Sequence, residues 1–208
     1  MVRKTKQEAL ETRESLLDAA GKVFCEKGVT NASLADIAEC AGVTRGAVYW
    51  HFKNKTDLIE ALWRRTEMPV DESWGDSCCV TGSDPLKAIR DQAIDCLHRA
   101  VTDVNTRQVW DILFHKCENV DETAVLKSRL LASRDDCARN VAKMFNEAVK
   151  AGQLPKSLDI ETAIVGMFCY IEGLIYNWLM TPGSIDLEKS AGTYVDIYLN
   201  GLKHADAA

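Results

Sequence analysis

The chain has 208 residues, of which 47% are hydrophobic and 27% are charged, with a formal net charge of −6. This composition fits a globular protein of one or two domains, and the acidic balance excludes a generic binder of polyanions. Residues 1–65 carry a net charge of +2 and the remainder −8, which suits a protein that touches nucleic acid with one end only. The opening MVRKTKQEAL lacks the apolar core of a secretory signal, so we expect a cytoplasmic protein.

Apolar residues recur at helical spacing almost throughout, and the chain contains only four prolines, so the sequence predicts an all-α fold of about nine helices. Capping patterns and glycine or proline stops give the helix bounds. In chain order, the expected helices cover about 5–27, 33–41, 44–51, 54 to the mid-seventies at most, 85–102, 105–117, 122–151, 159–180 and 186–202.

The two short helices at 33–41 and 44–51 are joined by a tight turn that contains Gly42. This arrangement is typical of a helix-turn-helix, whose second helix enters the major groove of DNA. On that second helix Val48 and Phe52 share one face, which we expect to be buried. Arg45 and Tyr49 share another face, which we expect to point outward. An ordinary pair of packed helices is the alternative.

The outward residues have the chemistry that DNA recognition requires. Arg45 can donate two hydrogen bonds to a guanine edge, and Gly46 allows the helix backbone to approach the DNA closely. Tyr49 and His51 can donate to phosphate oxygens, and Lys55 brings a positive charge to the start of the next helix.

Residues 33–38, SLADIA, and residues 42–55, GVTRGAVYWHFKNK, closely resemble the DNA-binding domain of TetR-family regulators. The segments RKTK at 3–6 and ILFHKCE at 112–118 look like the branch that represses multidrug efflux pumps. The resemblance implies a repressor that binds a palindromic double-stranded operator as a homodimer and is released by a small molecule. It implies a DNA-binding domain over 1–55 and a ligand-binding and dimerisation domain over 56–208. Matching positions that contact DNA in the family are Ser33, Thr44, Arg45, Gly46, Tyr49, His51 and Lys55.

The segment 160–180 is apolar nearly all round, yet Glu161, Glu172 and Asn177 argue against a membrane span. Its two apolar faces both need cover. Dimerisation through the last two helices would cover them, and burial within one subunit is the alternative. The resemblance favours the dimer.

The same resemblance implies a site for lipophilic ligands, cationic ones especially, because aromatic faces and carboxylates attract organic cations. Glu172 either pairs with an Arg or Lys of another helix or awaits such a ligand, and the same choice applies to Glu67. The expected lining is Trp63, Glu67, Trp110, Phe114, Cys137, Phe168, Glu172 and Tyr176.

Two other functions are open to the same sequence. The eight cysteines could act in a redox-sensing repressor, with Cys78, Cys79 and Cys137 as first candidates. Their spacing contains no C-x-x-C pair, so no metal site is expected, and no cofactor is implied. An enzyme is disfavoured because the sequence shows no nucleophile with an adjacent base, no paired carboxylates and no phosphate-binding loop.

Overall fold

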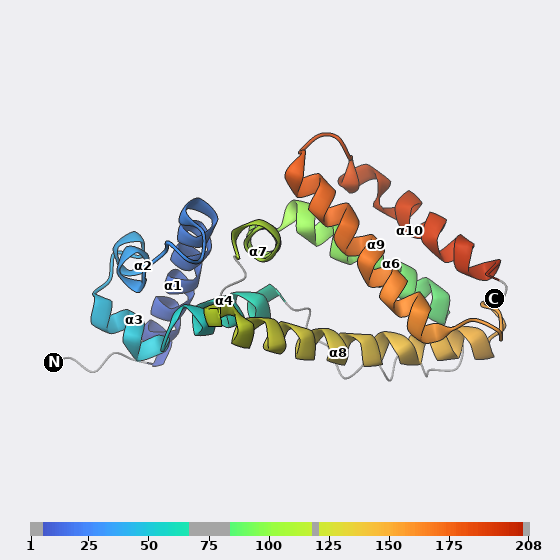
Figure 1. The fold of residues 1–208 in the computed structure, drawn as a ribbon, viewed down its shortest axis with the longest axis horizontal. Helices are drawn as coiled ribbons and strands as arrows, with labels where there is room; N and C mark the ends of the chain where they lie inside the picture. Colours follow the sequence, from blue (N-terminus) through green and yellow to red (C-terminus); the bar gives the residue numbers. More distant parts are fainter. Residues whose placement is uncertain (1–5, 67–83, 118–120, 206–208) are drawn as a thin grey trace. The chain divides into compact units, whose positions relative to one another are not determined.

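The computed structural model describes residues 6–66, 84–117 and 121–205, and throughout these ranges the regular backbone is helical (Figure 1). The helices are α1 Lys6–Lys27, α2 Leu34–Cys40, α3 Arg45–His51, α4 Lys55–Thr66, α6 Pro85–Thr102, α7 Val104–Asp111, η1 Ile112–Lys116, α8 Asp121–Lys150, α9 Ile160–Met180 and α10 Leu187–Lys203. The predicted all-α fold is confirmed.

The observed bounds follow the predicted ones closely, with one difference in kind. The helix expected over 105–117 is regular only as far as Asp111, and Ile112–Lys116 continues it as a wider π-helical turn. Such turns are rare and frequently lie at functional sites. The expected cap at Thr5 and the extension of the fourth helix beyond Thr66 lie outside the described residues.

The chain divides into two compact units, an N-terminal unit of residues 1–67 and 104–131 and a C-terminal unit of residues 68–103 and 132–208. In the N-terminal unit, α1 packs against α2, α4, α7 and η1. Its core joins residues of the first helices, such as Leu16 and Phe24, to Val109 and Ile112. Residues 104–116 are therefore part of the body that carries the helix-turn-helix. The predicted boundary at residue 55, between a DNA-binding domain and a ligand-binding domain, divides the chain by function and remains a prediction.

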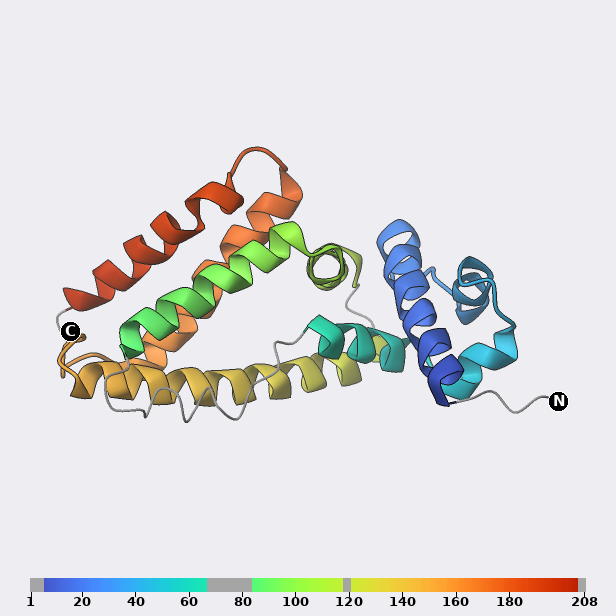
Figure 2. The same cartoon turned by 180° about the vertical axis from the view of Figure 1, so that it is seen from behind.

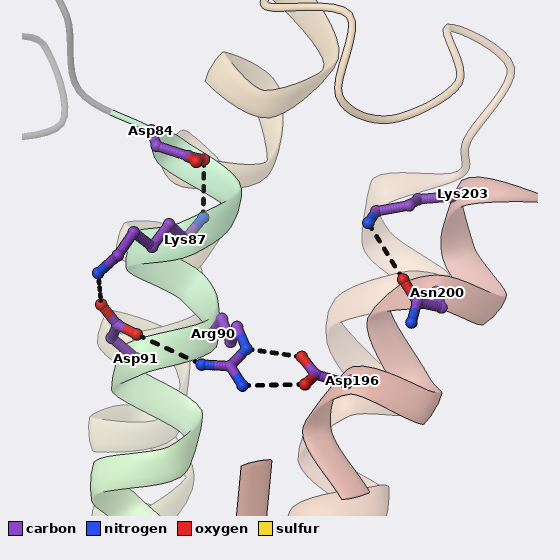
Figure 3. A network of polar contacts seen from close by, with 7 residues as sticks. All are labelled: Asp84, Lys87, Arg90, Asp91, Asp196, Asn200 and Lys203. Carbon is purple, nitrogen blue, oxygen red and sulfur yellow. Dashed lines mark hydrogen bonds and ion pairs between the residues drawn. The ribbon is translucent and has the colours of Figure 1, made fainter. Parts of the chain in front are cut away.

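In the C-terminal unit, α6, α9 and α10 lie side by side, as both views show (Figures 1 and 2). Arg90 of α6 makes a two-pronged ion pair with Asp196 of α10, with Nε and Nη2 at 2.6 and 2.9 Å from the two carboxylate oxygens (Figure 3). Gln153 links the end of α8 to the start of α6, since its amide nitrogen donates to Asp84 and its oxygen accepts from the Leu86 amide.

Candidate functional site

The helix-turn-helix begins with a complete capping box at α2. The Ser33 hydroxyl oxygen accepts from the Asp36 amide at 3.1 Å, and the Asp36 carboxylate accepts from the Ser33 amide at 2.8 Å. Lys27 at the end of α1 forms a 2.8 Å ion pair with Asp36. Hydrogen bonds from Lys27, which has the largest effect, and from Ser33 hold the pKa of Asp36 well below its usual range. Ser33 therefore has a structural task in addition to its proposed contact with DNA.

The turn between α2 and α3 has the expected geometry. Gly42 has a φ of +65°, a conformation that other residues adopt only at a cost, and this turn leads to Thr44. The Thr44 hydroxyl accepts from the Ala47 amide at 3.3 Å and so caps α3. Val48 is fully buried and Phe52 nearly so, which confirms the predicted inward face.

The opposite face of α3 is open. Arg45, Gly46 and Tyr49 are exposed, as predicted, and the Arg45 guanidinium lies 6.0 Å from the centre of the Tyr49 ring. This cation–π contact holds the Arg45 guanidinium near the Tyr49 ring. Tyr49 can thus orient Arg45 as well as donate to phosphate.

Trp50 also lies on this face, although it was not predicted from the sequence. Its side chain is 72% exposed, and its ring packs edge-on against His51 with centroids 4.4 Å apart. Residues two positions from Val48 lie roughly 200° around the helix from it, so Gly46 and Trp50 occupy the middle of the outward face. The helical spacing from Val48 could have revealed this, because the same count that places Val48 inward places Trp50 outward.

Lys55 lies where expected, at the first turn of α4, but its ammonium group is engaged. Its Nζ donates to the carbonyl oxygens of Val29 at 2.8 Å and Thr30 at 3.1 Å. An ammonium has three donors, so one remains for another acceptor. Lys55 therefore joins α4 to the loop after α1, and the neighbouring exposed lysine is Lys53.

Within the N-terminal unit, three of the expected ligand-lining residues form an aromatic cluster. Trp63 of α4 meets Trp110 of α7 edge-on at 5.8 Å, and Trp110 stacks on Phe114 of η1 at 5.2 Å. The aromatic cluster thus joins α4 to the π-helical turn. An ion pair between Arg65 of α4 and Asp18 of α1, 2.7 Å long, also joins α4 to α1. Glu67, expected beside Trp63, lies outside the described residues.

Within the C-terminal unit, Phe168 and Glu172 of α9 lie one turn apart and both contact Arg134 of α8. The Arg134 Nη1 is 3.6 Å from the Glu172 carboxylate, and its guanidinium carbon is 5.3 Å from the Phe168 ring centre. Burial raises the pKa of Glu172 and Arg134 opposes that rise. Glu172 thus takes the first of its two predicted alternatives, an ion pair with another helix. Cys137 is half-buried on α8, and Tyr176 is 41% exposed on α9.

The thiols that show a resolved shift are held in the protonated form. Burial raises the pKa of Cys25 and of Cys96 to about 12, and raises that of Cys117 as well. Since the thiolate is the species that oxidants attack, these three cysteines do not favour the redox interpretation. Cys78 and Cys79 lie outside the described residues.

The capped short helices, the glycine turn and the exposed arginine together define a DNA-binding helix-turn-helix protein. Residues 16–62 match the family described as bacterial regulatory proteins, tetR family. Residues 84–204 match the family described as MAATS-type transcriptional repressor, C-terminal region. The chain belongs to the TetR family of transcriptional regulators. Members of this family bind operator DNA, form dimers and respond to small molecules, and they are not enzymes.

Whole-length relatives support the same assignment. The chain is 41% identical over 207 residues to the HTH-type transcriptional regulator TtgR of Pseudomonas putida, covering 100% of this chain and 99% of the relative. A crystal structure of NalD, the secondary repressor of the MexAB-OprM multidrug efflux pump in Pseudomonas aeruginosa, superposes with a TM-score of 0.85 at 29% identity, covering 97% and 100% of the two chains. The SmeT–triclosan complex gives 0.81 at 27% identity, covering 95% and 94%.

One helix among the described residues, α9, is long and apolar enough to cross a membrane. It packs instead against α6 and α10, with Ile164, Ile171 and Ile175 among its buried residues. It also carries Glu161 and Glu172, which a membrane span would rarely hold. We interpret α9 as a packed helix of the C-terminal unit and not as a membrane span.

Proposed function

We propose that this regulator represses an operon for a multidrug efflux pump and releases its operator when a lipophilic aromatic compound binds. The observation that carries the proposal is the open face of α3, with Arg45 and Trp50 exposed on a helix anchored by Val48. NalD and SmeT, both of which resemble the chain over nearly its whole length, are described as efflux-pump repressors. The operator lies in the cytoplasm, where we place the protein.

We propose that Arg45 reads a base edge, that Gly46 lets the helix approach, and that Tyr49 and His51 hold phosphates. Trp50 joins this set because an exposed indole in the middle of the outward face can contact thymine methyl groups or sugars. Ser33, Thr44 and Lys55 complete the set, each with its present hydrogen-bonding role inside the helix-turn-helix retained.

We propose that α9 and α10 form the homodimer interface. Val165, Met180 and Ile197 are large apolar side chains that are each more than half exposed on these two helices. Burial of such side chains between two copies is favourable by about 25 cal/mol per Å². With two recognition helices related by a two-fold axis, the operator should be palindromic, and its half-sites should lie roughly one helical turn or a multiple apart.

We propose candidate ligand contacts within each unit: the aromatic cluster Trp63–Trp110–Phe114 with Glu67 in the N-terminal unit, and Cys137, Phe168, Glu172 and Tyr176 in the C-terminal unit. SmeT in its complex with triclosan, a chlorinated aromatic, supports a site of this character. Release requires that the ligand prefer a conformation that fits the operator badly, because equal affinity for both states shifts nothing. The helix α4 joins the aromatic cluster to Lys55 beside the recognition helix, so it is our candidate transmitter.

Footprinting on the DNA upstream of the chain's own gene tests the proposal, followed by titration of the complex with triclosan and with hydrogen peroxide. We expect a protected palindrome that triclosan releases and peroxide leaves intact. Release by peroxide that Cys→Ser substitutions prevent would establish the redox alternative. Absence of any protected site there, together with a monomeric protein at micromolar concentration, would refute the proposal.

A further inference from the structure

The carboxylate proposed to receive a positive ligand already holds a positive group of the chain. Arg134 of α8 lies 3.6 Å from Glu172 and 5.3 Å from the Phe168 ring centre. Phe168 and Glu172 are four residues apart on α9, so they share one face of that helix. The guanidinium therefore contacts a carboxylate and an aromatic face at the same time.

The contact is a loose one. A tight charge-assisted hydrogen bond spans about 2.7–2.9 Å, shorter than the 3.6 Å between Arg134 and Glu172. Both side chains also remain partly open to solvent, with 38% and 33% of their surfaces exposed. An arginine held in this way loses little when it moves into water, since exposed ion pairs contribute only about 0–1 kcal/mol.

The two groups that Arg134 contacts are those that recognise an organic cation. An aromatic ring attracts a cation through its face, and a carboxylate supplies the opposite charge. Burial raises the pKa of the nearby Cys96 thiol, so that thiol is uncharged at neutral pH, and Glu172 is the carboxylate that Arg134 contacts. A cationic ligand and Arg134 therefore need the same two surfaces.

We propose that Arg134 is a built-in competitor for cations at this site, which a cationic ligand must displace before it can contact Glu172 and Phe168. The inference rests on the proposed ligand-binding function and sharpens its ligand class. Neutral aromatic compounds can bind without separating the pair, so the site favours them over permanent cations. Removal of Arg134 should then strengthen cation binding, the opposite of what removal of an ordinary lining residue does.

The test compares two probes of similar shape on the full-length protein by calorimetric titration. Tetraphenylphosphonium is the cationic probe, and triphenylphosphine oxide is the neutral one. For Arg134→Gln we expect roughly tenfold tighter binding of the cation and little change for the neutral probe. Glu172→Gln should abolish that gain when it is combined with Arg134→Gln.

Arg139→Gln is the matched control, because Arg139 also lies on α8 and pairs with an acidic residue, Asp136, on the surface. It should leave both affinities unchanged. Arg134→Lys retains the charge without the planar guanidinium, and we expect it to give a smaller gain, so it tests the inference if the glutamine variant does not fold. Thermal unfolding of each variant identifies any that are misfolded.

The possible outcomes separate the two claims. Equal or weaker cation binding by folded Arg134 variants, with the neutral probe still bound, overturns the inference and leaves the proposed function standing. If neither probe binds saturably to the wild type or to any variant, the ligand-binding proposal fails, and the inference fails with it.

Discussion

The helices α3 and α9 differ in how their functional residues are distributed along the sequence. The seven residues of α3 carry a cap, a buried anchor at Val48 and an exposed reading face at Arg45 and Trp50. In α9, the ion pair of Glu172 depends on Arg134, which lies on a different helix, α8. DNA presents the same groove to every such helix, so its recognition can be contained in one contiguous segment. A small ligand is enclosed by side chains from several helices, and these meet only in the folded chain.

The largest expected effect tests whether these two helices belong to separately stable bodies. Phe24 in the N-terminal unit and Phe145 in the C-terminal unit are both fully buried. Phe24→Ala and Phe145→Ala should each lower the free energy of unfolding by about 3–5 kcal/mol, through lost burial and a cavity. Denaturant unfolding followed by helical circular dichroism measures both.

If the two units unfold independently, Phe24→Ala should shift only one of two transitions and Phe145→Ala only the other. A single shared transition displaced equally by both substitutions would show that the molecule unfolds as one body. The exposed Leu10→Ala on α1 is the control for both, and it should change the stability little.

The next effect concerns the reading face of α3. Arg45→Ala should cost on the order of 1–3 kcal/mol per half-site and relax the base preference. Quantitative footprinting on the operator and on single-base variants checks this. Trp50→Ala should weaken binding and leave the preference at the base read by Arg45 intact. Loss of that preference in the Trp50 variant alone would reverse the two roles.

The third effect separates Lys55 from Lys53. Lys55→Ala removes two hydrogen bonds to backbone carbonyls, so it should reduce the free energy of unfolding by about 1–3 kcal/mol. It also removes a charge, so the slope of the logarithm of the DNA-binding constant against the logarithm of salt concentration should fall by about one per half-site. Lys53, whose side chain is exposed, should affect only the salt dependence when changed to alanine. Unchanged stability of the Lys55 variant would contradict its linking role.

The smallest effect concerns how stability changes with pH in acid. The pKa of Asp36 is lowered because Lys27 and Ser33 donate to its carboxylate. A carboxyl whose pKa falls on folding contributes stability that is fully present above its unfolded pKa of about 3.9 and is lost as the pH falls through the folded value. Asp36→Asn should therefore remove part of the decline in stability below about pH 4. An identical acid profile for the variant and the wild type would contradict this linkage.

The fold was predictable from the sequence because its signals are local. Capping residues such as Asp84 and Asp159, which do cap α6 and α9, marked the helix starts, and apolar spacing marked the core. The inward and outward faces of α3 followed from the same spacing. Trp50 could not be predicted from hydrogen-bonding chemistry, because its contribution to the surface is a large aromatic ring that lies two residues from the buried Val48.

The remainder depended on contacts between segments distant in sequence. Nothing near Lys55 indicates that its ammonium is shared by the carbonyls of Val29 and Thr30. Likewise, no local pattern selects Arg134 as the partner of Glu172. The π-helical turn at Ile112–Lys116 belongs to the same class, because it is formed where residues 104–116 pack against α1 and α4.

One hydrogen bond gives this packing an observable consequence. The Val29 amide, in the loop before α2, donates to the carbonyl of Lys116 at the end of η1, with a distance of 3.0 Å. Its proton can exchange with solvent only when the π-helical turn withdraws from the loop. In deuterated water, the exchange rate of that single amide proton therefore reports how often the turn opens. The measurement requires no probe attached to the chain, and it can be made in the presence or absence of operator and inducer.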